Sequence, residues 1–227
     1  MNYFQPNDLN SALDVLQNNS DLTIAAGCTD LFPITNNMSL DKNILDITNI
    51  KSIKGFQFNS KETKIGSATT WTDIINENLP SCYDMLKACA KEVGSIQIQN
   101  LGTIGGNICN ASPAADSIPC LLALDAKLEL SSANNQRIIP IDEFILGSRK
   151  TKLEQGEILT SIIIPKEKEN GSSSFRKIGA RKYLVISISM VACRILISNN
   201  IIEDISISVG SCSCLLYTSD AADEEDS

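Results

Sequence analysis

The chain contains no histidine among its 227 residues. This absence excludes imidazole metal ligands, Ser-His-Asp and Cys-His nucleophile systems, and histidine acid–base catalysis. It equally excludes a flavin attached covalently through histidine. Any chemistry must therefore come from carboxylates, thiols, lysines or a bound cofactor, and demanding redox chemistry usually belongs to the cofactor.

Long apolar segments and an excess of positive charge are also missing. No apolar run approaches the roughly 20 residues that span a bilayer. The N-terminus, Met1–Pro6, has neither the basic region nor the apolar segment of a signal peptide. We therefore expect a cytoplasmic protein with no membrane partner. The net charge of −8 also argues against a nucleic-acid partner, which requires a basic face.

Cysteine is plentiful, but its spacing does not indicate a metal site. Only Cys212 and Cys214 are close in sequence, and no Cys-x-x-Cys pair occurs, so we expect neither zinc nor an iron–sulfur cluster in this chain. In a reducing cytosol the cysteines are expected to be free and buried. The eight are Cys28, Cys82, Cys89, Cys109, Cys120, Cys193, Cys212 and Cys214.

The last fourteen residues, 214–227, carry five acidic residues and no basic ones. Their run from Cys214 to Glu224 resembles the translation of a sequencing adapter, and we set it aside as an artefact rather than a native acidic tail. Without it, 22 acidic residues face 19 basic ones, a net charge of −3. On this interpretation the genuine sequence is cut at about Ser213, within a strand-rich segment.

Hydrophobic periodicity predicts mixed helices and strands, and therefore an α+β fold. Residues 166–174 are polar and are expected to form a linker between domains. Asn199 and Asn200 are expected to form a tight turn between two apolar strands. The expected helices are 8–16, 71–76 with Thr70 as N-cap, 82–93, and 114–124 with Ser112 as cap; the expected strands are 22–25, 43–47, 63–66, 126–130, 137–141, 158–164, 185–197 and 201–209.

The most informative stretch is Gly102-Thr103-Ile104-Gly105-Gly106-Asn107. Three glycines within five residues let the backbone approach a ligand closely, because no Cβ stands in the way. Successive bare N–H groups in such a turn form a concavity that binds anions. The apolar run from Ile118 to Ala126 follows as a rigid support. This pattern predicts a site for a phosphate-bearing cofactor.

A second loop, Ala26-Gly27-Cys28-Thr29-Asp30, follows the expected strand 22–25. Neither loop has the pattern Gly-x-Gly-x-x-Gly of a Rossmann fold or Gly-x4-Gly-Lys-Ser/Thr of a P-loop, so both interpretations are excluded. Each loop alone is typical of a plain tight turn. Two such loops, roughly 75 residues apart, can clamp a pyrophosphate between them. Asp30 itself is expected to stabilise its loop through N–H contacts rather than touch phosphate.

These stretches together resemble one family. Ala26-Gly27-x-Thr29-Asp30-Leu31, residues 65–70 (Ile-Gly-Ser-Ala-Thr-Thr), residues 103–108 (Thr-Ile-Gly-Gly-Asn-Ile) and residues 111–117 (Ala-Ser-Pro-Ala-Ala-Asp-Ser) stand in the order seen in FAD-binding subunits of molybdenum hydroxylases. That family includes xanthine, carbon monoxide and nicotinate-type dehydrogenases. The resemblance runs from Tyr3 to about Val209 and is greatest to bacterial xanthine dehydrogenase flavin subunits.

The resemblance implies a p-cresol methylhydroxylase-like FAD-binding fold of two α+β subdomains, residues 1–60 and 61–166. Residues 173–213 would begin an incomplete C-terminal α+β domain. The implied activity is that of an oxidoreductase subunit, passing electrons from iron–sulfur clusters through non-covalent FAD to NAD+. The molybdenum cofactor and 2Fe-2S clusters would reside in a molybdenum-binding subunit and an iron–sulfur subunit of the same complex.

The resemblance also implies site residues, none of them catalytic. Asp116 would contact the ribityl or phosphate region, and Phe175 and Lys177 would close the site. Ile158 and Leu159 would contact the flavin through backbone and apolar surface. The pyrophosphate would lie between two segments: Thr23, Ile24, Ala25, Ala26, Gly27, Cys28, Thr29 and Asp30 on one side, and Gly102, Thr103, Ile104, Gly105 and Gly106 on the other.

The chain departs from the family pattern at three places. Cys28 replaces the usual second glycine of the first loop, and Gln99 replaces an arginine. No acid stands near residues 183–185, where some relatives carry one. These departures leave open a flavin-free assembly or maturation module of the same fold. The FAD subunit of a carbon monoxide or nicotinate-type dehydrogenase is a further alternative. A free-standing flavin oxidase is disfavoured because no separate substrate domain is evident.

Overall fold

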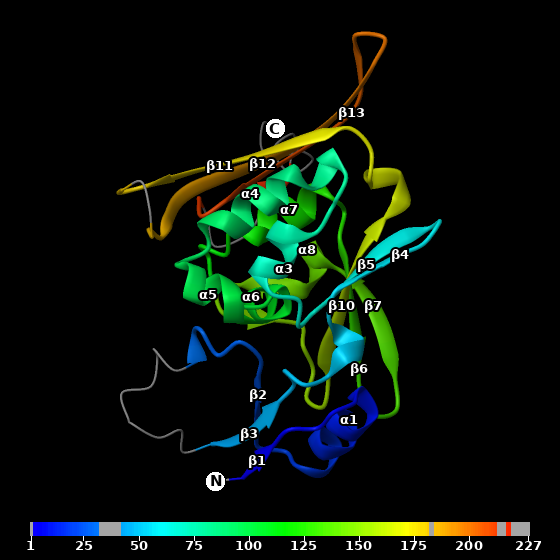
Figure 1. Ribbon diagram of the computed structural model, residues 1–227, viewed down its shortest axis with the longest axis vertical. Coiled ribbons are helices and arrows are strands. Elements are labelled where there is room, and N and C mark those ends of the chain that lie inside the picture. The colour runs from blue at the N-terminus through cyan, green and yellow to red at the C-terminus, as the bar shows by residue number, and fades with distance from the viewer. Residues whose placement is uncertain (1, 32–41, 182–183, 213–216, 219–227) are drawn as a thin grey trace, which may run out of the picture.

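The computed structural model describes residues 2–31, 42–181, 184–212 and 217–218. Three β-sheets are stacked along the long axis, with most of the helices between the second and the third (Figure 1). The predicted artefactual tail, residues 214–227, lies outside the described residues except for Tyr217–Thr218. Among the described helices, none combines the length and apolar character that crossing a bilayer requires.

The N-terminal unit is a small parallel sheet covered by one helix. Its strands β1 (Tyr3–Phe4), β2 (Leu22–Ala25) and β3 (Asn43–Asp46) are arranged in the order β1-β3-β2. Helix α1 (Leu9–Asn18) begins after Asp8, whose carboxylate accepts the Ser11 N–H at 2.9 Å as an N-cap. Its apolar face packs on β3, as the helical spacing predicts.

The central unit is a five-stranded antiparallel sheet in the order β4-β5-β10-β6-β7. Strand β10 is its middle, and seven of its eight residues are buried, which accounts for its continuous apolar and small-polar run. A short 3-10 helix, η1 (Lys51–Ile53), precedes the first strand of this sheet, β4. The strands are β4 (Phe56–Phe58), β5 (Glu62–Gly66), β6 (Lys127–Ser131), β7 (Gln136–Pro140) and β10 (Ile158–Pro165).

Helices pack against this sheet around one main core that includes Trp71, Met85 and Leu121. Helix α3 begins with the predicted cap, because Thr70 and Asp73 exchange hydrogen bonds in a capping box. The helical segments are α3 (Trp71–Asn76), η2 (Ser81–Tyr83), α4 (Asp84–Glu92), α5 (Ile96–Leu101), α6 (Ile104–Asn110), α7 (Ser117–Ala123), α8 (Ile141–Phe144) and η3 (Lys166–Lys168).

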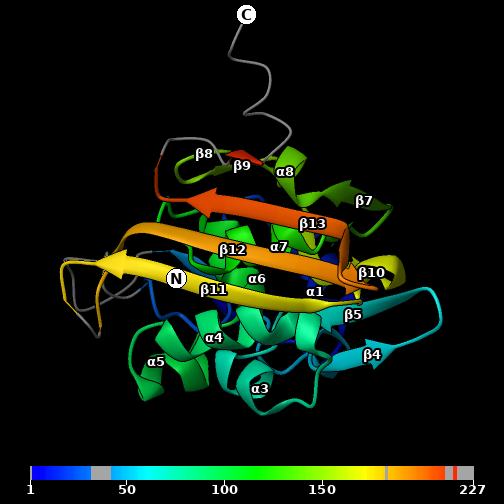
Figure 2. The same cartoon turned by 90° about the horizontal axis from the view of Figure 1, so that it is seen from above.

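A C-terminal sheet covers helices α4 and α7 (Figure 2). It contains β11 (Ser172–Gly179), β12 (Ser187–Ser198), β13 (Ile201–Gly210) and β14 (Tyr217–Thr218). Asn199 and Asn200 both adopt positive φ, 51° and 62°, as a two-residue hairpin turn requires, so the predicted turn is confirmed.

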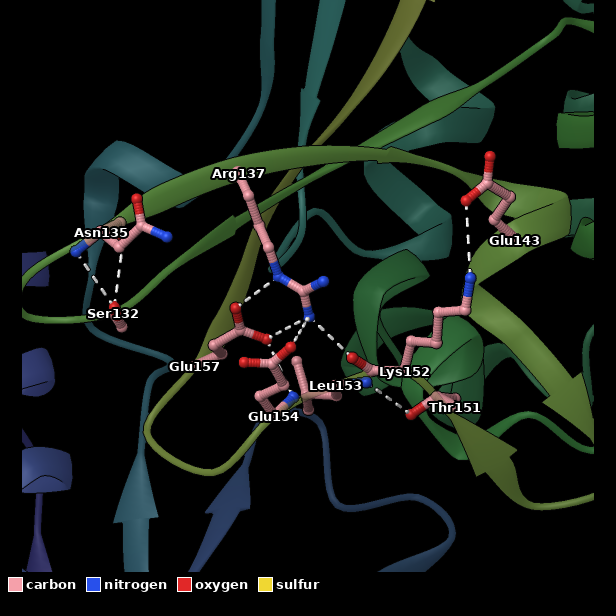
Figure 3. Close-up of polar contacts among 9 residues, drawn as sticks. All are labelled: Ser132, Asn135, Arg137, Glu143, Thr151, Lys152, Leu153, Glu154 and Glu157. Atoms are coloured by element: carbon pink, nitrogen blue, oxygen red, sulfur yellow. Dashed lines mark hydrogen bonds and ion pairs between the residues drawn. The ribbon is translucent and has the colours of Figure 1, made fainter.

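Between β7, an edge strand of the central sheet, and β10, its middle strand, the chain forms a short hairpin. Strands β8 (Ile145–Gly147) and β9 (Lys150–Thr151) form it. The following segment is anchored to β7 by Arg137, which donates to Glu157 at 2.7 and 2.9 Å and to the Lys152 carbonyl at 2.8 Å (Figure 3). A bidentate pair of this kind fixes the chain between the hairpin and β10.

Three sequence-based expectations differ from the structure. The helix expected over 114–124 begins only at Ser117, because residues 111–116 form turns after α6. The expected linker 166–174 contains η3 and the start of β11. Helices α5 and α6 were not expected; the two glycines and two asparagines of α6 have low helix propensity.

Candidate functional site

The two glycine-containing loops lie against each other. A Cβ placed on Gly27 would lie 1.8 Å from the Leu101 carbonyl oxygen and 2.9 Å from the Gly102 Cα. Only glycine permits so close an approach of two backbones. The structure therefore brings together the first loop, residues 26–30 after β2, and the second loop, residues 102–106.

The first loop presents unused backbone donors. In the described part of the chain, the N–H groups of residues 27–30 donate no hydrogen bond to another described residue. Buried or partly buried N–H groups without protein partners are normally satisfied by water or ligand. Consecutive free N–H groups in a turn can form an anion-binding concavity, and the donors of this loop are compatible with one.

Cys28 occupies the centre of this loop in an unusual backbone conformation. Its φ is 56°, in the left-handed region that a residue with a Cβ adopts at a cost. Its thiol is 3.4 Å from the Ala26 carbonyl oxygen. Burial and the nearby Asp46 carboxylate raise the pKa of this thiol, so it is protonated near neutral pH and is a poor nucleophile.

The second loop does not have the bare N–H groups that the sequence predicted. Ile104 N–H donates to the Thr69 carbonyl at 3.0 Å and Gly105 N–H to the Ser67 carbonyl at 2.8 Å. Gly106 N–H donates to Thr103 Oγ1 at 3.1 Å, as a helix N-cap. That expectation is wrong because residues 104–110 are helical and dock on the turn after β5. The second loop supports the first through packing instead.

Asp116 and Lys177 form a buried ion pair between α7 and β11. Their Oδ2 and Nζ atoms are 2.8 Å apart, and each side chain is 7% exposed. The Ser187 hydroxyl donates to the other Asp116 oxygen, and Lys177 also contacts the Glu92 carbonyl at 3.3 Å. The structure therefore brings these two predicted site residues together, bonded to each other rather than left open.

The predicted apolar site residues are largely enclosed in the core. Ile158 packs with the N-terminal unit, while Leu159 and Phe175 belong to the main core. Thr23 and Ile24 are half-buried on β2, and Ala25 is buried.

Sequence reasoning missed Arg149, which stands in the turn of the β8–β9 hairpin. Its guanidinium donates to Asp30 at 2.6 Å and to the side-chain oxygen of Asn110. The expected contact of Asp30 with its own loop is thus replaced by an ion pair from another unit. The only signal in the sequence is an arginine two residues after Gly147, between two short strands. The side-chain amide of Gln99, the residue that replaces the family's arginine, donates to the Lys91 carbonyl.

A cavity of about 710 Å³ lies between the end of α4 and the end of β11. Three cations line it, Lys91, Lys177 and Arg181, against one carboxylate, Glu92. Its apolar wall includes Leu184 and Val185. Its volume is in the range typical of small-molecule sites, and its charge favours an anionic ligand.

Sequence comparison identifies the relatives of this chain. Residues 1–167 match the family described as FAD binding domain in molybdopterin dehydrogenase. The chain belongs to this family. This FAD-binding domain is 32% identical over 212 residues to a xanthine dehydrogenase FAD-binding subunit of Escherichia coli O157:H7, covering 92% of this chain and 73% of that protein. It is 34% identical over 195 residues to a nicotinate dehydrogenase FAD-subunit of Eubacterium barkeri, covering 82% and 65%.

Solved structures confirm the predicted α+β class of the FAD-binding domain. Carbon monoxide dehydrogenase from Hydrogenophaga pseudoflava contains a chain that superposes with a TM-score of 0.87 at 25% identity, covering 98% of this chain and 78% of that one. Quinoline 2-oxidoreductase from Pseudomonas putida 86 shares the fold, with a TM-score of 0.86 at 21% identity. The resemblance read from the motifs is likewise confirmed.

The residues present fit a phosphate-bearing flavin. Donors for its phosphates are the N–H groups of residues 27–30, which have no partner in the described chain. Contact between Gly27 and the Leu101–Gly102 backbone holds this loop in place. A cation, Arg149, lies beside the loop and offsets Asp30. These features fit the first loop to the phosphates of such a cofactor.

Proposed function

We propose that this chain binds FAD non-covalently through its first loop and serves as the electron-transfer subunit of a molybdenum hydroxylase. The observation that carries the proposal is the set of N–H groups at residues 27–30 that have no partner among the described residues, in a loop where Gly27 packs against Gly102. Thr23–Asp30 would hold the pyrophosphate, with Gly102–Gly106 as the supporting wall. Asp116, Ile158, Leu159, Phe175 and Lys177 would border the rest of the cofactor.

FAD, when bound, supplies a centre that accepts and passes on electrons, one or two at a time. On this proposal no side chain of the chain needs to act as an acid, base or nucleophile. The residues bind, orient and shield the cofactor. The proposed partners are an iron–sulfur subunit and a molybdenum-binding subunit, which would carry 2Fe-2S clusters and the molybdenum cofactor. The relatives named as subunits or medium chains support this arrangement.

We propose a xanthine dehydrogenase-like complex with NAD+ as electron acceptor. The cavity beside Lys177 supports a dinucleotide acceptor, because Lys91 and Arg181 offer charge to its phosphates, while the charge of Lys177 is balanced by Asp116. The 32% identity to a xanthine dehydrogenase subunit supports a xanthine dehydrogenase-like complex. The comparable 34% identity to a nicotinate dehydrogenase subunit supports a nicotinate dehydrogenase-like complex as the alternative. Turnover of xanthine against nicotinate by the purified complex distinguishes the two.

We also propose a cytoplasmic location. The seven cysteines in the described part of the chain are all free thiols, including the exposed Cys212. Free thiols are typical of a reducing compartment.

The FAD site is tested by crowding the contact between the loops. Gly27→Ala places a Cβ against the Leu101 carbonyl and is expected to weaken FAD binding at least about tenfold, because the first loop must move. Gly210→Ala is the matched control. Gly210 lies on β13 of the C-terminal sheet, and a Cβ there would lie 2.8 Å from Pro119 of α7. A folded Gly27→Ala protein that retains stoichiometric FAD would refute the loop assignment.

The acceptor is tested by adding NADH without oxygen to the FAD-loaded chain. Bleaching of the visible flavin absorption, comparable to that produced by dithionite, is expected. Bleaching by dithionite but not by NADH would refute NAD+ as acceptor and leave the FAD site intact.

A further inference from the structure

Arg149 ties the first loop to the end of helix α6. One terminal nitrogen of its guanidinium donates to Asp30 at 2.6 Å and to the Asn110 side chain. Its own N–H donates to the Ala111 carbonyl at 2.7 Å. The contact with Asp30 joins residues 119 positions apart, so the hairpin β8–β9 is held over the first loop.

Backbone strain gathers at this contact. Cys28, Ala111 and Arg149 adopt φ values of 56°, 43° and 57°, all left-handed and none of them glycine. Each such residue is strained and persists only where its surroundings enforce the conformation. Arg149 bonds directly to Ala111, and its partner Asp30 is two residues from Cys28. Strain of this kind concentrates at ligand clamps, which marks this corner as more than a surface ion pair.

The guanidinium also has donors to spare. Both of its side-chain bonds begin at the same nitrogen, and within residues 2–31, 42–181, 184–212 and 217–218 its Nε and its other terminal nitrogen have no acceptor. The side chain is 47% exposed, so this edge is accessible. A guanidinium edge binds phosphate through two parallel N–H groups.

Charge leads to the same conclusion. Asp30 stands at the end of a loop whose N–H groups attract an anion, and its carboxylate alone would repel one. The ion pair with Arg149 cancels that repulsion while leaving the unpaired guanidinium edge positive. Arg149 thus removes the net negative charge of this corner and adds N–H donors to it.

We propose that Arg149 is a phosphate-binding residue of the FAD site. Asp30 and Asn110 hold one of its nitrogens, and the remaining N–H groups bind a phosphate oxygen together with the N–H groups of residues 27–30. This inference rests on the proposed FAD binding and assigns a specific cation to it.

The test compares two ligands on the full chain after its flavin has been removed. FAD carries two phosphates and riboflavin carries none, and binding of both is followed by flavin fluorescence. Arg149→Gln is expected to weaken FAD binding about 30-fold, the loss of a charged hydrogen bond, and riboflavin binding less than about twofold. It should also reduce the dependence of the FAD Kd on NaCl, because one cation at the phosphates is lost.

Two further variants complete the design. Arg149→Lys keeps the charge without the planar edge and is expected to recover part of the FAD affinity. Arg176→Gln is the matched control: Arg176 is exposed on β11, makes no ion pair with a described residue, and should leave both affinities unchanged. Circular dichroism establishes that each variant is folded, and Arg149→Lys replaces Arg149→Gln if the latter is not.

Three results would overturn the proposal, and they are distinguishable. Unchanged FAD affinity in Arg149→Gln, with wild type binding FAD, refutes the role of Arg149 and leaves the FAD site intact. Equal weakening of FAD and riboflavin shows that Arg149 only holds the loops together. Failure of the folded wild type to bind FAD overturns the proposed function itself.

Discussion

Lys177 and Asp116 form an ion pair of 2.8 Å in which both side chains are almost completely buried. The pair fastens strand β11 of the C-terminal sheet to the start of helix α7. The hydroxyl of Ser187, on β12, donates a hydrogen bond to the other oxygen of the Asp116 carboxylate. The C-terminal sheet is therefore locked to the central unit by charge as well as by the packing of Phe175.

Breaking this pair is expected to destabilise the protein strongly. Asp116→Asn removes the nearest counter-ion of the buried Lys177 and leaves only the partly exposed Glu92 carboxylate, at 3.7 Å, so the cost is expected at the lower end of about 3–5 kcal/mol. Urea unfolding measures the loss. Lys152→Met provides the control, because the pair of Lys152 and Glu143 is exposed and its removal should change the free energy of unfolding by less than about 1 kcal/mol. Equal losses in the two variants would contradict the role given to burial.

Replacing Cys28 with glycine is expected to stabilise the first loop. Its left-handed backbone costs a residue with a Cβ about 1 kcal/mol, which glycine avoids. Cys28→Gly should therefore raise the free energy of unfolding and tighten FAD binding. Cys28→Ala separates the causes, since it removes the thiol and keeps the Cβ. A gain in Cys28→Ala as large as in Cys28→Gly would show that the thiol, not the backbone, is responsible.

Stability is expected to depend on the protonation of Glu157. The Arg137 hydrogen bond holds the pKa of this carboxyl below its ordinary value of 4.5, against the effect of burial (Figure 3). A lowered folded-state pKa means that its contribution is complete above the unfolded pKa and is lost as pH falls through the folded one.

Glu157→Gln should therefore cost about 2 kcal/mol at pH 7 and much less at pH 2–3. Urea unfolding across this pH range measures the difference. Glu154 also faces Arg137, at 3.3 Å, but is 71% exposed, so Glu154→Gln should be nearly neutral. A cost for Glu157→Gln that stays constant with pH would contradict the account.

Local sequence signals foretold much of the fold. Thr70 correctly predicted the start of α3, where it forms a capping box with Asp73. Asn199-Asn200 correctly predicted the hairpin turn. Both features depend on neighbouring residues alone. The N–H groups of the second loop are not bare donors, partly because Ile104 and Gly105 bond to residues 69 and 67, more than 30 positions away. Arg149 was missed for the same reason: its partner Asp30 is distant in sequence.

The flavin content of the folded full chain tests the central claim most directly. After purification and addition of FAD, excess ligand is removed and the protein is precipitated with acid. The account predicts one flavin per chain, released entirely into the supernatant and identified as FAD. A chain that is folded by circular dichroism yet retains no flavin would contradict it and favour the flavin-free assembly module.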